Sequence, residues 1–320
     1  MSYYANVTSF YDNHLLTHRD VRYVDYNSVN ADGAGKTWET AFHTIAAAVA
    51  VVDQGGVILI KGKNVAATAT DPSSYAEVVS ITTPQIHLLG VGSRVQGGLP
   101  QIKMGSGAVA QVTIAAPGVT IEKIGFNGVS ATGGGILLDD DGGSTKSAAG
   151  AAVLDCHFKN CVGSTATNAA TGGAIQWAAT GGAWQVLIKG NRFYKNVGDV
   201  VLKGTTGSVP QDVVIEENIF SGPAANVDCN LYLAGGSGMN GVIIRNNVFS
   251  AIPALGGTND KMLVLTGCVG ILTGNMFACE DARTFGAAGD ELVPTTVFMA
   301  GNFSEKAVAQ VANGGDICRT

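Results

Sequence analysis

Three consecutive carboxylates are the residues of this chain best suited to chemistry. Asp139, Asp140 and Asp141 follow the apolar segment 136–138 and precede a Gly- and Ser-rich loop at 142–150. Grouped carboxylates can bind a divalent cation or supply the acid and base of a glycan hydrolase. A charged run at the end of a strand is also typical of a solvated turn. Because charge alone is weak evidence for a functional site, the solvated turn is the favoured interpretation. We therefore assign no catalytic residue and keep these three aspartates as candidates.

The cysteines and histidines show no pattern of a metal centre. No two of the six Cys residues form a Cys-x-x-Cys pair, and no His follows them at zinc-binding spacing. We therefore expect no metal and no cofactor, and we interpret the cysteines as buried free thiols in a reducing compartment. Trp177, Trp184 and Tyr232 could form a sugar-stacking face, so carbohydrate binding stays open.

A sequence repeat indicates the fold that would position these residues. An apolar segment, a polar step and a Phe recur along the chain. The phrase ends at Phe126, Phe158, Phe193, Phe220, Phe249 and Phe277, which are 32, 35, 27, 29 and 28 residues apart, and Phe303 follows 26 residues later. A period of this length predicts a solenoid in which each repeat buries its apolar face against its neighbours.

The repeat unit consists of short strands. The apolar segments are four to six residues long, rich in Val, Ile and Leu, and bounded by Gly, Asn, Asp and Ser. No segment between 55 and 300 has a sustained 3.6-residue apolar period, which excludes helical repeats. The pattern predicts an all-β fold, a single-stranded right-handed parallel β-helix of about seven or eight coils from 57 to 303.

Two columns of like residues are expected inside this solenoid. Asn191, Asn218, Asn247 and Asn275 occupy the same position in four successive repeats. Stacked amides donate to one neighbouring coil and accept from the other, so we predict a structural ladder rather than a ligand site. The Phe two residues later should point inward. The predicted ring stack is formed by Phe158, Phe193, Phe220, Phe249 and Phe277.

The segment before the repeats predicts a lid for the stack. Residues 37–53 place Phe42, Ile45 and Val49 on one helical face, with Thr37 as the N-cap. A helix there would cover the unpaired strand edges at the N-terminal end. The expected organisation is an anchoring arm at 1–21, a cap at 22–56 containing the helix, the β-helix at 57–303 and a C-terminal cap or tail at 304–320.

The opening of the chain resembles a known superfamily. Residues 23–33, 36–45 and 55–60 together look like the start of pectin-lyase-like β-helix proteins. That superfamily includes polysaccharide lyases, glycoside hydrolases and many bacteriophage spike and decoration proteins, so the resemblance implies a fold rather than an activity. Its polygalacturonase-like members share a Gly-His-Gly signature and an Arg-Ile-Lys motif. No His here lies in Gly-His-Gly, and residues 187–189 read Leu-Ile-Lys, so the family's catalytic residues cannot be carried over.

The composition indicates which kinds of binding partner to expect. Only 14% of the residues are charged and the mean hydropathy is +0.23, which favours self-association, and we expect a homotrimer with parallel axes. A net charge of −6 without a Lys or Arg cluster argues against nucleic-acid binding. No uninterrupted apolar stretch reaches 18 residues, so we expect no membrane span. The N-terminus lacks the pattern of a signal peptide, which predicts synthesis in a host cytoplasm.

These observations favour a non-enzymatic virion protein. The N-terminal arm carries Tyr3, Tyr4, Phe10 and Tyr11, aromatic residues of the kind that anchor interfaces, and we expect it to bind a capsid or tail protein. The resemblance implies a bacteriophage structural protein, a trimeric β-helix displayed as a decoration protein, spike or fibre. The alternatives are a tailspike-type polysaccharide hydrolase or lyase acting on a host surface glycan, and a carbohydrate-binding adhesin.

Overall fold

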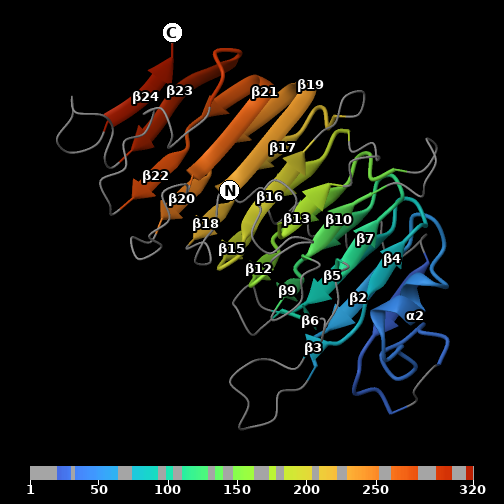
Figure 1. The fold of residues 1–320 in the computed structure, drawn as a ribbon. Helices are drawn as coiled ribbons and strands as arrows, with labels where there is room; N and C mark the ends of the chain where they lie inside the picture. Colours follow the sequence, from blue (N-terminus) through green and yellow to red (C-terminus); the bar gives the residue numbers. More distant parts are fainter. Residues whose placement is uncertain are drawn as a thin grey trace, which may run out of the picture.

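A computed structural model shows one long stack of short β-strands with a short helix near its N-terminal end (Figure 1). The structure describes residues 20–29, 33–63, 74–92, 99–103, 110–128, 134–139, 147–161, 173–177, 184–203, 209–221, 229–251, 261–279, 293–304 and 315–319. Strands pair in parallel with their equivalents one coil away, except that β24 is antiparallel to β23. The predicted all-β parallel β-helix is confirmed.

Each coil contributes strands to three faces. The first face contains β1 (Val21–Val24), β2 (Val57–Lys61), β5 (His87–Val91), β8 (Thr120–Glu122), β11 (Ala152–Leu154), β14 (Leu187–Lys189) and β17 (Val214–Glu216), then the later parts of β19 (Cys229–Arg245) and β21 (Lys261–Thr273) and the start of β23 (Val297–Ser304).

The other two faces follow the same order. The second face contains β3 (Ser74–Tyr75), β6 (Gln101–Lys103), β9 (Gly125–Asn127), β12 (His157–Lys159), β15 (Arg192–Tyr194), β18 (Ile219–Ser221), β20 (Val248–Ala251), β22 (Met276–Cys279) and the end of β23. The third face contains β4 (Val79–Ile81), β7 (Val112–Ile114), β10 (Ile136–Leu138), β13 (Ile175–Trp177), β16 (Gly198–Lys203) and the starts of β19 and β21. The last strand is β24 (Gly315–Arg319).

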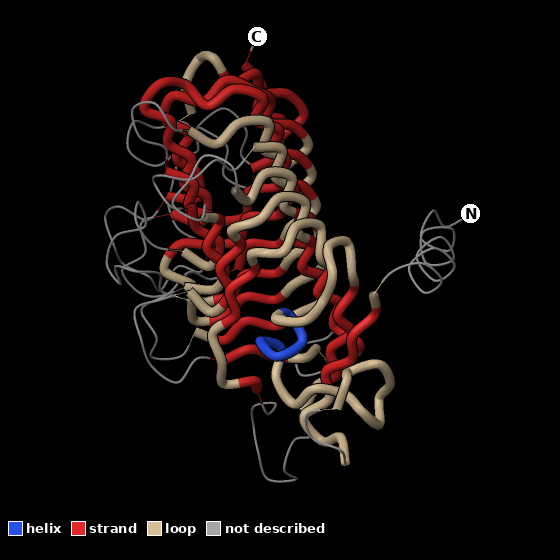
Figure 2. The backbone as a smooth tube through the Cα atoms, turned by 90° about the vertical axis from the view of Figure 1, so that its right-hand side faces the viewer, coloured by secondary structure: helices blue, strands red, loops and turns tan. Residues whose placement is uncertain are grey.

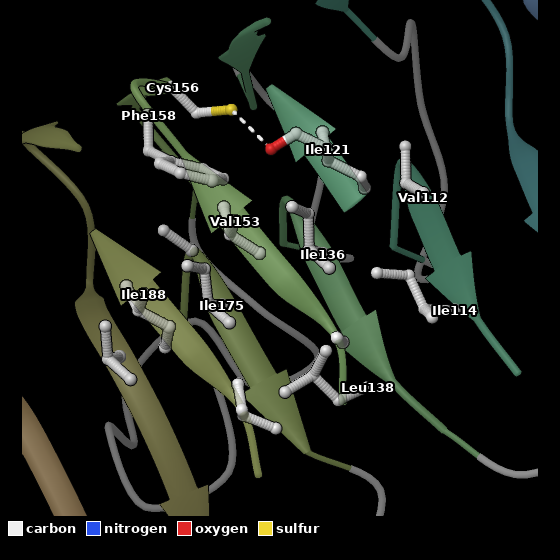
Figure 3. Packing of buried hydrophobic residues seen from close by; sticks show 14 of the residues in the cluster. Val112, Ile114, Ile121, Ile136, Leu138, Val153, Cys156, Phe158, Ile175 and Ile188 are labelled. Carbon is white, nitrogen blue, oxygen red and sulfur yellow. Dashed lines mark hydrogen bonds between the residues drawn. The ribbon is translucent and has the colours of Figure 1, made fainter. Parts of the chain in front are cut away.

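Strand register keeps apolar residues in columns along the solenoid axis. The inward column of the first face is formed by Ile58, Leu88, Ile121, Val153, Ile188, Ile215, Ile244, Leu272 and Met299. These nine strands plus β1 give ten levels, so the coil count differs from the seven or eight predicted. Side chains from all three faces meet in one interior, as Figure 3 shows around Val153 and Ile136. Burial of these apolar columns is the main stabilising term of the fold.

A stack of phenylalanine rings runs through this interior. Neighbouring centroids are 4.7–5.0 Å apart and the rings are within 12° of parallel. Such aromatic contacts stabilise beyond simple area burial. The stack is formed by Phe126, Phe158, Phe193, Phe220, Phe249 and Phe277.

Phe303 does not join the ring stack, although it follows the same sequence period. It pairs with Met276 rather than with Phe277, and more than half of its surface is exposed. The cause is local spacing, because Phe303 comes directly after Asn302 whereas Met276 separates Asn275 from Phe277. Since successive strand residues face opposite sides, the missing residue turns the Phe303 ring outward.

A ladder of buried asparagines lies at the turn between the first and second faces. The amide Nδ2 of every rung but the last donates to the Oδ1 of the next Asn at 2.9–3.0 Å. Each Nδ2 also donates to a main-chain carbonyl of the preceding coil at 2.8–3.0 Å. The ladder consists of Asn191, Asn218, Asn247, Asn275 and Asn302, one more coil than the four of the sequence pattern. These bonds satisfy polar groups that the solenoid buries.

The helix is much shorter than the 37–53 segment predicted for it. Helix α2 covers Ile45–Val49, and its N-cap is Thr44 rather than Thr37. The residues before it pair with β1 instead, since Phe42 N donates to Tyr23 O and Asp25 N donates to Phe42 O, both at 2.9 Å. Tertiary hydrogen bonding therefore overrides the helical pattern. The helix still packs against the first coils, as Figure 2 shows in blue.

Candidate functional site

A groove opens on the outer surface where the first face turns into the second. Its volume is about 280 Å³, and seven of its eight lining residues come from three successive coils that contain β11–β12, β14–β15 and β17–β18, while Leu99 precedes β6. We call it the Gly190 groove. It is lined by Leu99, Asp155, Cys156, His157, Gly190, Arg192, Glu217 and Ile219.

The backbone of the turn explains why the groove forms here. Asp155, Gly190 and Glu217 occupy the same turn in successive coils, with φ of 50°, 70° and 57°. Glycine adopts this left-handed conformation without steric cost. A Cβ at Gly190 would lie 2.4 Å from Asp155 Oδ1, so the Asp155 carboxylate leans over the glycine. The missing side chain at Gly190 therefore makes room for the Asp155 carboxylate.

Asp155 and Glu217 are the two acidic residues that line the groove. They lie two levels apart, and a strand spacing of ~4.8 Å places their backbones about 10 Å from each other. Inverting glycoside hydrolases hold their two carboxyl groups about 6.5–9.5 Å apart, with room for a water between them. Asp155 and Glu217 line the groove from its first and third coils.

His157 and Arg192 form the second-face wall of the groove. They are direct register partners on β12 and β15. Burial, followed by the nearby charges of Lys159 and Arg192, lowers the pKa of His157 below its usual value. At neutral pH the imidazole is therefore uncharged and able to donate or accept a hydrogen bond. Arg192 is exposed and offers a planar set of donors to an incoming oxygen ligand.

An ion-pair network supports the Glu217 end of the groove. Lys189 Nζ donates to Glu216 Oε1 at 2.7 Å and to Glu217 Oε1 at 3.1 Å, and Arg245 Nε donates to Glu216 Oε2 at 2.5 Å. Burial alone would raise the pKa of Glu216, but the bonds from Lys189 and Arg245 outweigh it and hold that pKa below its ordinary value. Glu216 is buried within this network, whereas Glu217 faces solvent.

Cys156 lies in the groove wall, but its thiol points into the core. The Sγ atom donates to Ile121 O at 3.7 Å (Figure 3). Burial raises the pKa of this thiol to about 12. A protonated, buried thiol is a poor nucleophile, so Cys156 has a packing role. The described cysteines Cys161 and Cys268 are likewise buried and free.

The aspartates singled out in the sequence lie away from the groove. Asp139 follows β10 on the third face, where its N–H donates to Ile114 O at 2.8 Å and its carbonyl accepts from Ala148 N at 3.0 Å. Asp140 and Asp141 lie outside the described residues. Asp139 and the Gly190 groove therefore belong to different faces of the solenoid.

The aromatic candidates are not gathered on one surface. Trp177 is buried, Trp184 is exposed in the turn before β14, and Tyr232 packs against Val264 on the third face. The structure therefore gives no shared sugar-stacking face from these three residues. The arm aromatics Tyr3, Tyr4, Phe10 and Tyr11 lie outside the described residues.

The described ranges contain neither a metal-binding cluster nor a membrane-spanning helix. Among these residues, no three His, Cys, Asp or Glu side chains gather so that they could hold a metal ion. No helix in the described part of the chain has the length and apolar character needed to cross a membrane.

The groove residues were not found by reading the sequence, although a signal was present. Aligning the repeats sets Asp155-Cys-His157 above Gly190-Asn-Arg192 and Glu217-Asn-Ile219. The middle position carries the ladder, while the outer two positions vary and face solvent. Polar residues at varying, outward positions of a regular repeat are free of packing constraints, and that is where a site is expected.

Comparisons with known proteins give a likeness in fold. No family model and no curated protein matches the chain. Among solved structures, ORF18 of Geobacillus virus E2 is 11% identical with a TM-score of 0.48, covering 99% of this chain and 67% of that one. PfbA, a surface adhesin of Streptococcus pneumoniae, is 11% identical with a TM-score of 0.44, covering 88% and 80%. The GH136 lacto-N-biosidase from Eubacterium ramulus is 10% identical with a TM-score of 0.42, covering 88% and 68%. Identities this low leave activity open.

Proposed function

We propose that the chain is a non-enzymatic structural protein of a bacteriophage virion. In this proposal it is a homotrimeric β-helix on the capsid or tail surface, as a decoration protein, spike or fibre. The observation that carries it is the unbroken pair of internal columns, in which the Asn amides and the Phe rings join successive coils from Phe126 to Asn302. The resemblance of residues 23–60 to the opening of β-helix proteins used by phages supports the same role.

The internal columns suit a mechanical role. Coils of a solenoid contact only their neighbours, so stiffness depends on each coil-to-coil interface. Here every interface from β12 to the end of β23 adds an amide hydrogen bond or a ring contact to the strand pairing. Such a rod resists bending and local opening, as an exposed part of a particle requires.

Attachment is assigned to the N-terminal arm. The cap is anchored from Asp20 onward: its carboxylate accepts from Arg22 Nε at 2.9 Å and from Asp53 N at 3.1 Å, and its carbonyl accepts from Val57 N at 2.8 Å. Residues 2–19 precede all these contacts and include Tyr3, Tyr4, Phe10 and Tyr11. Removing them should therefore leave the β-helix folded while removing the proposed capsid or tail contact.

The experiment is particle incorporation of a chain that lacks residues 2–19. The truncated chain should keep the β-sheet circular dichroism and the melting temperature of the full chain, and it should be absent from purified particles. A matched control lacks residues 307–312, which leaves four residues to connect the paired Ser304 and Gly315, and it should still be incorporated. Incorporation of the truncated chain at the full level would contradict the arm assignment, and absence of the full chain from particles would contradict the virion role.

The Gly190 groove favours a second candidate, a tailspike-type hydrolase or lyase, or an adhesin that binds a host glycan without cleaving it. In the hydrolase version, Asp155 and Glu217 are the acid and base. The test is whether the chain shortens a bacterial surface polysaccharide, measured by size-exclusion chromatography. Asp155→Asn and Glu217→Gln should then abolish shortening, whereas Glu39→Gln, an exposed carboxylate in the cap, should not. Loss of activity in Asp140→Asn alone would instead place the site at residues 139–141.

A further inference from the structure

The second face of the solenoid carries cations but no carboxylates on its strands. The described strands of this face from β3 to β22 contain no Asp or Glu, whereas the whole chain has 25 acidic residues and a net charge of −6. Four basic side chains belong to this face or to the turn that follows it: Lys103, Lys159, Arg192 and Lys195. We call this set the second-face cationic strip.

Strand register brings these cations together, although they are far apart in the sequence. Successive register partners on β6, β9, β12 and β15 form one column, which consists of Lys103, Asn127, Lys159 and Tyr194. On β9, β12 and β15 the residue before each member is a buried Phe, so the column itself points outward. Arg192 shares the outward side of β15, and Lys195 follows in the turn. At ~4.8 Å per level, the strip extends about 14 Å along the solenoid axis.

The strip differs from the first face in how its charges are compensated. On the first face and its turn, Lys123, Lys189 and Arg245 each pair with a glutamate at 2.5–2.8 Å. Arg192 and Lys195 are exposed, and neither forms an ion pair with a carboxylate in the described part of the chain. An uncompensated positive surface on an acidic protein favours an anionic partner.

His157 lies within the same positive surroundings. It is the register partner of Arg192, and Lys159 lies on its own strand. Burial, followed by the charges of these two neighbours, lowers the pKa of the imidazole. The ring is therefore neutral at pH 7 and can donate one N–H to an oxygen of a ligand.

The strip continues into the Gly190 groove, because Arg192 and His157 also line that groove. Glu217 in the groove already pairs with Lys189 at 3.1 Å, whereas Arg192 has no such partner among the described residues. The groove therefore presents an uncompensated guanidinium beside carboxylate oxygens that can accept hydrogen bonds from hydroxyl groups. A ligand that carries both oxoanions and hydroxyl groups matches this combination.

We propose that the second-face cationic strip and the Gly190 groove together bind a linear polysaccharide that carries anionic groups. This inference rests on the second candidate function, glycan binding at the groove, and names the class of glycan. Arg192 and Lys195 bind the anionic groups through charge-assisted hydrogen bonds, and the groove carboxylates accept hydrogen bonds from ring hydroxyls. An acidic polypeptide carries the same charge with few hydroxyls, and Asp155 and Glu217 repel it.

The test is binding of the full chain to four polymers, measured by titration calorimetry at about 0.1 M salt, where exposed charges still interact over ~10 Å. Dextran sulfate and neutral dextran are a matched pair that differs in charge. Alginate carries carboxylates in place of sulfates, and poly(glutamate) is an acidic chain without sugar rings. Dextran sulfate or alginate should bind, and the one that binds more tightly identifies the preferred anion. Dextran and poly(glutamate) should bind at least ~10-fold more weakly.

Variants locate the binding surface. The double variant Arg192→Gln with Lys195→Gln should bind the preferred polymer at least ~10-fold more weakly, because it loses two charge-assisted contacts. Both positions are exposed, so its circular dichroism spectrum and melting temperature should not change. Lys203→Gln removes an exposed cation at the end of β16 on the third face, and this matched control should bind as the unchanged chain does.

Each other result overturns the inference. Undiminished binding by the double variant places the contact elsewhere, and an equal loss in Lys203→Gln shows that the attraction is not specific to the second face. Equal affinity for poly(glutamate) excludes a requirement for sugar rings. Equal affinity for neutral dextran overturns the charge assignment but leaves glycan binding in place, whereas failure to bind any of the four polymers counts against the glycan-binding candidate as well.

Discussion

The side chain of Asn247 joins three coils. Its Nδ2 donates to Asn275 Oδ1 of the next coil and to Ile215 O of the previous one, both at 3.0 Å. Its own Oδ1 accepts from the backbone N–H and from the Nδ2 of Asn218, again at 3.0 Å. Every polar atom of this buried amide is therefore satisfied by a neighbouring coil, so the loss of one rung affects the coils on both sides.

Replacing Asn247 by Ala should be strongly destabilising. The change removes the partner of the Asn218 N–H, one of the two bonds of the Asn218 Nδ2 and one bond to the carbonyl of Ile215, all in the core, which costs roughly 3 kcal/mol of unfolding free energy. Chemical denaturation measures the loss. Ser250→Ala, at a half-buried outward position of the same coil, is the control and should change stability by less than about 0.5 kcal/mol. Equal losses in the two variants would show that the ladder contributes nothing specific.

Replacing Phe220 by Ala should open a gap in the ring stack. Its ring lies 4.9 Å from Phe193 and 4.7 Å from Phe249, and it is fully buried. Truncation of a buried Phe costs about 3–5 kcal/mol. The adjacent, half-buried Ile219 points outward, and Ile219→Ala should cost about 1 kcal/mol or less. A small loss for Phe220→Ala in denaturant titrations would contradict the stack as a stabilising element.

Asp199 should make the stability of the protein depend on pH. Burial raises its pKa to about 7, although Asn196 and Asn230 donate to its oxygens at 2.9 and 2.7 Å. In the unfolded chain the pKa of Asp is about 3.9. Between these values the folded protein holds a proton that the unfolded chain has released. The free energy of unfolding should therefore fall as the pH rises from about 4 to 7, and it should level off above that.

Asp199→Asn provides the comparison for this titration, because an amide does not ionise. The variant should be less stable at the acid end, since its NH₂ group faces a donor, but its stability should vary less with pH. Denaturation of both proteins across the window measures the difference. Parallel pH profiles would exclude Asp199 as the source.

Replacing Gly190 by Ala should strain the groove. The residue has φ of 70°, and the new Cβ would lie 2.4 Å from Asp155 Oδ1. The two effects together should cost about 1–3 kcal/mol. Asp155→Ala removes the collision partner but leaves the backbone strain at residue 190. The free-energy cost of Gly190→Ala should therefore be smaller in the Asp155→Ala background than in the unchanged protein. Full tolerance of Gly190→Ala in thermal melts would contradict the turn geometry.

The fold was predictable because the sequence repeat reflects which residues pack in the interior. In a solenoid the same inward positions recur in every coil, so the spacing of Phe193, Phe220 and Phe249 reflects one structural unit repeated. The helix was harder, because the apolar positions of residues 37–43 fit a helical face while the pairing of Phe42 with Tyr23 and Asp25 depends on a strand elsewhere in the chain. The local pattern of apolar residues cannot show that pairing with β1 competes with helix formation.

The candidate site was less predictable for a related reason. A repeat identifies the residues that the interior constrains, whereas Asp155, His157, Arg192 and Glu217 occupy outward positions that differ from coil to coil. Their proximity depends on the register that stacks residues about 30 positions apart. The sequence suggested Asp139, Asp140 and Asp141 because they are adjacent in the chain. The groove residues come from different coils and are adjacent only in the folded structure.

The antiparallel strand β24 covers part of the last coil. A stack of parallel coils has no intrinsic end, since the last coil offers the next one the same unpaired edge. Here the chain reverses direction and β24 pairs with β23, with Asn302 opposite Ile317 and Phe303 opposite Asp316. Antiparallel pairing spaces its hydrogen bonds differently from parallel pairing, so the edge left over no longer matches an incoming parallel coil. β24 therefore occupies the edge of β23 between Met299 and Ser304, and an incoming parallel coil cannot pair with that part of the strand.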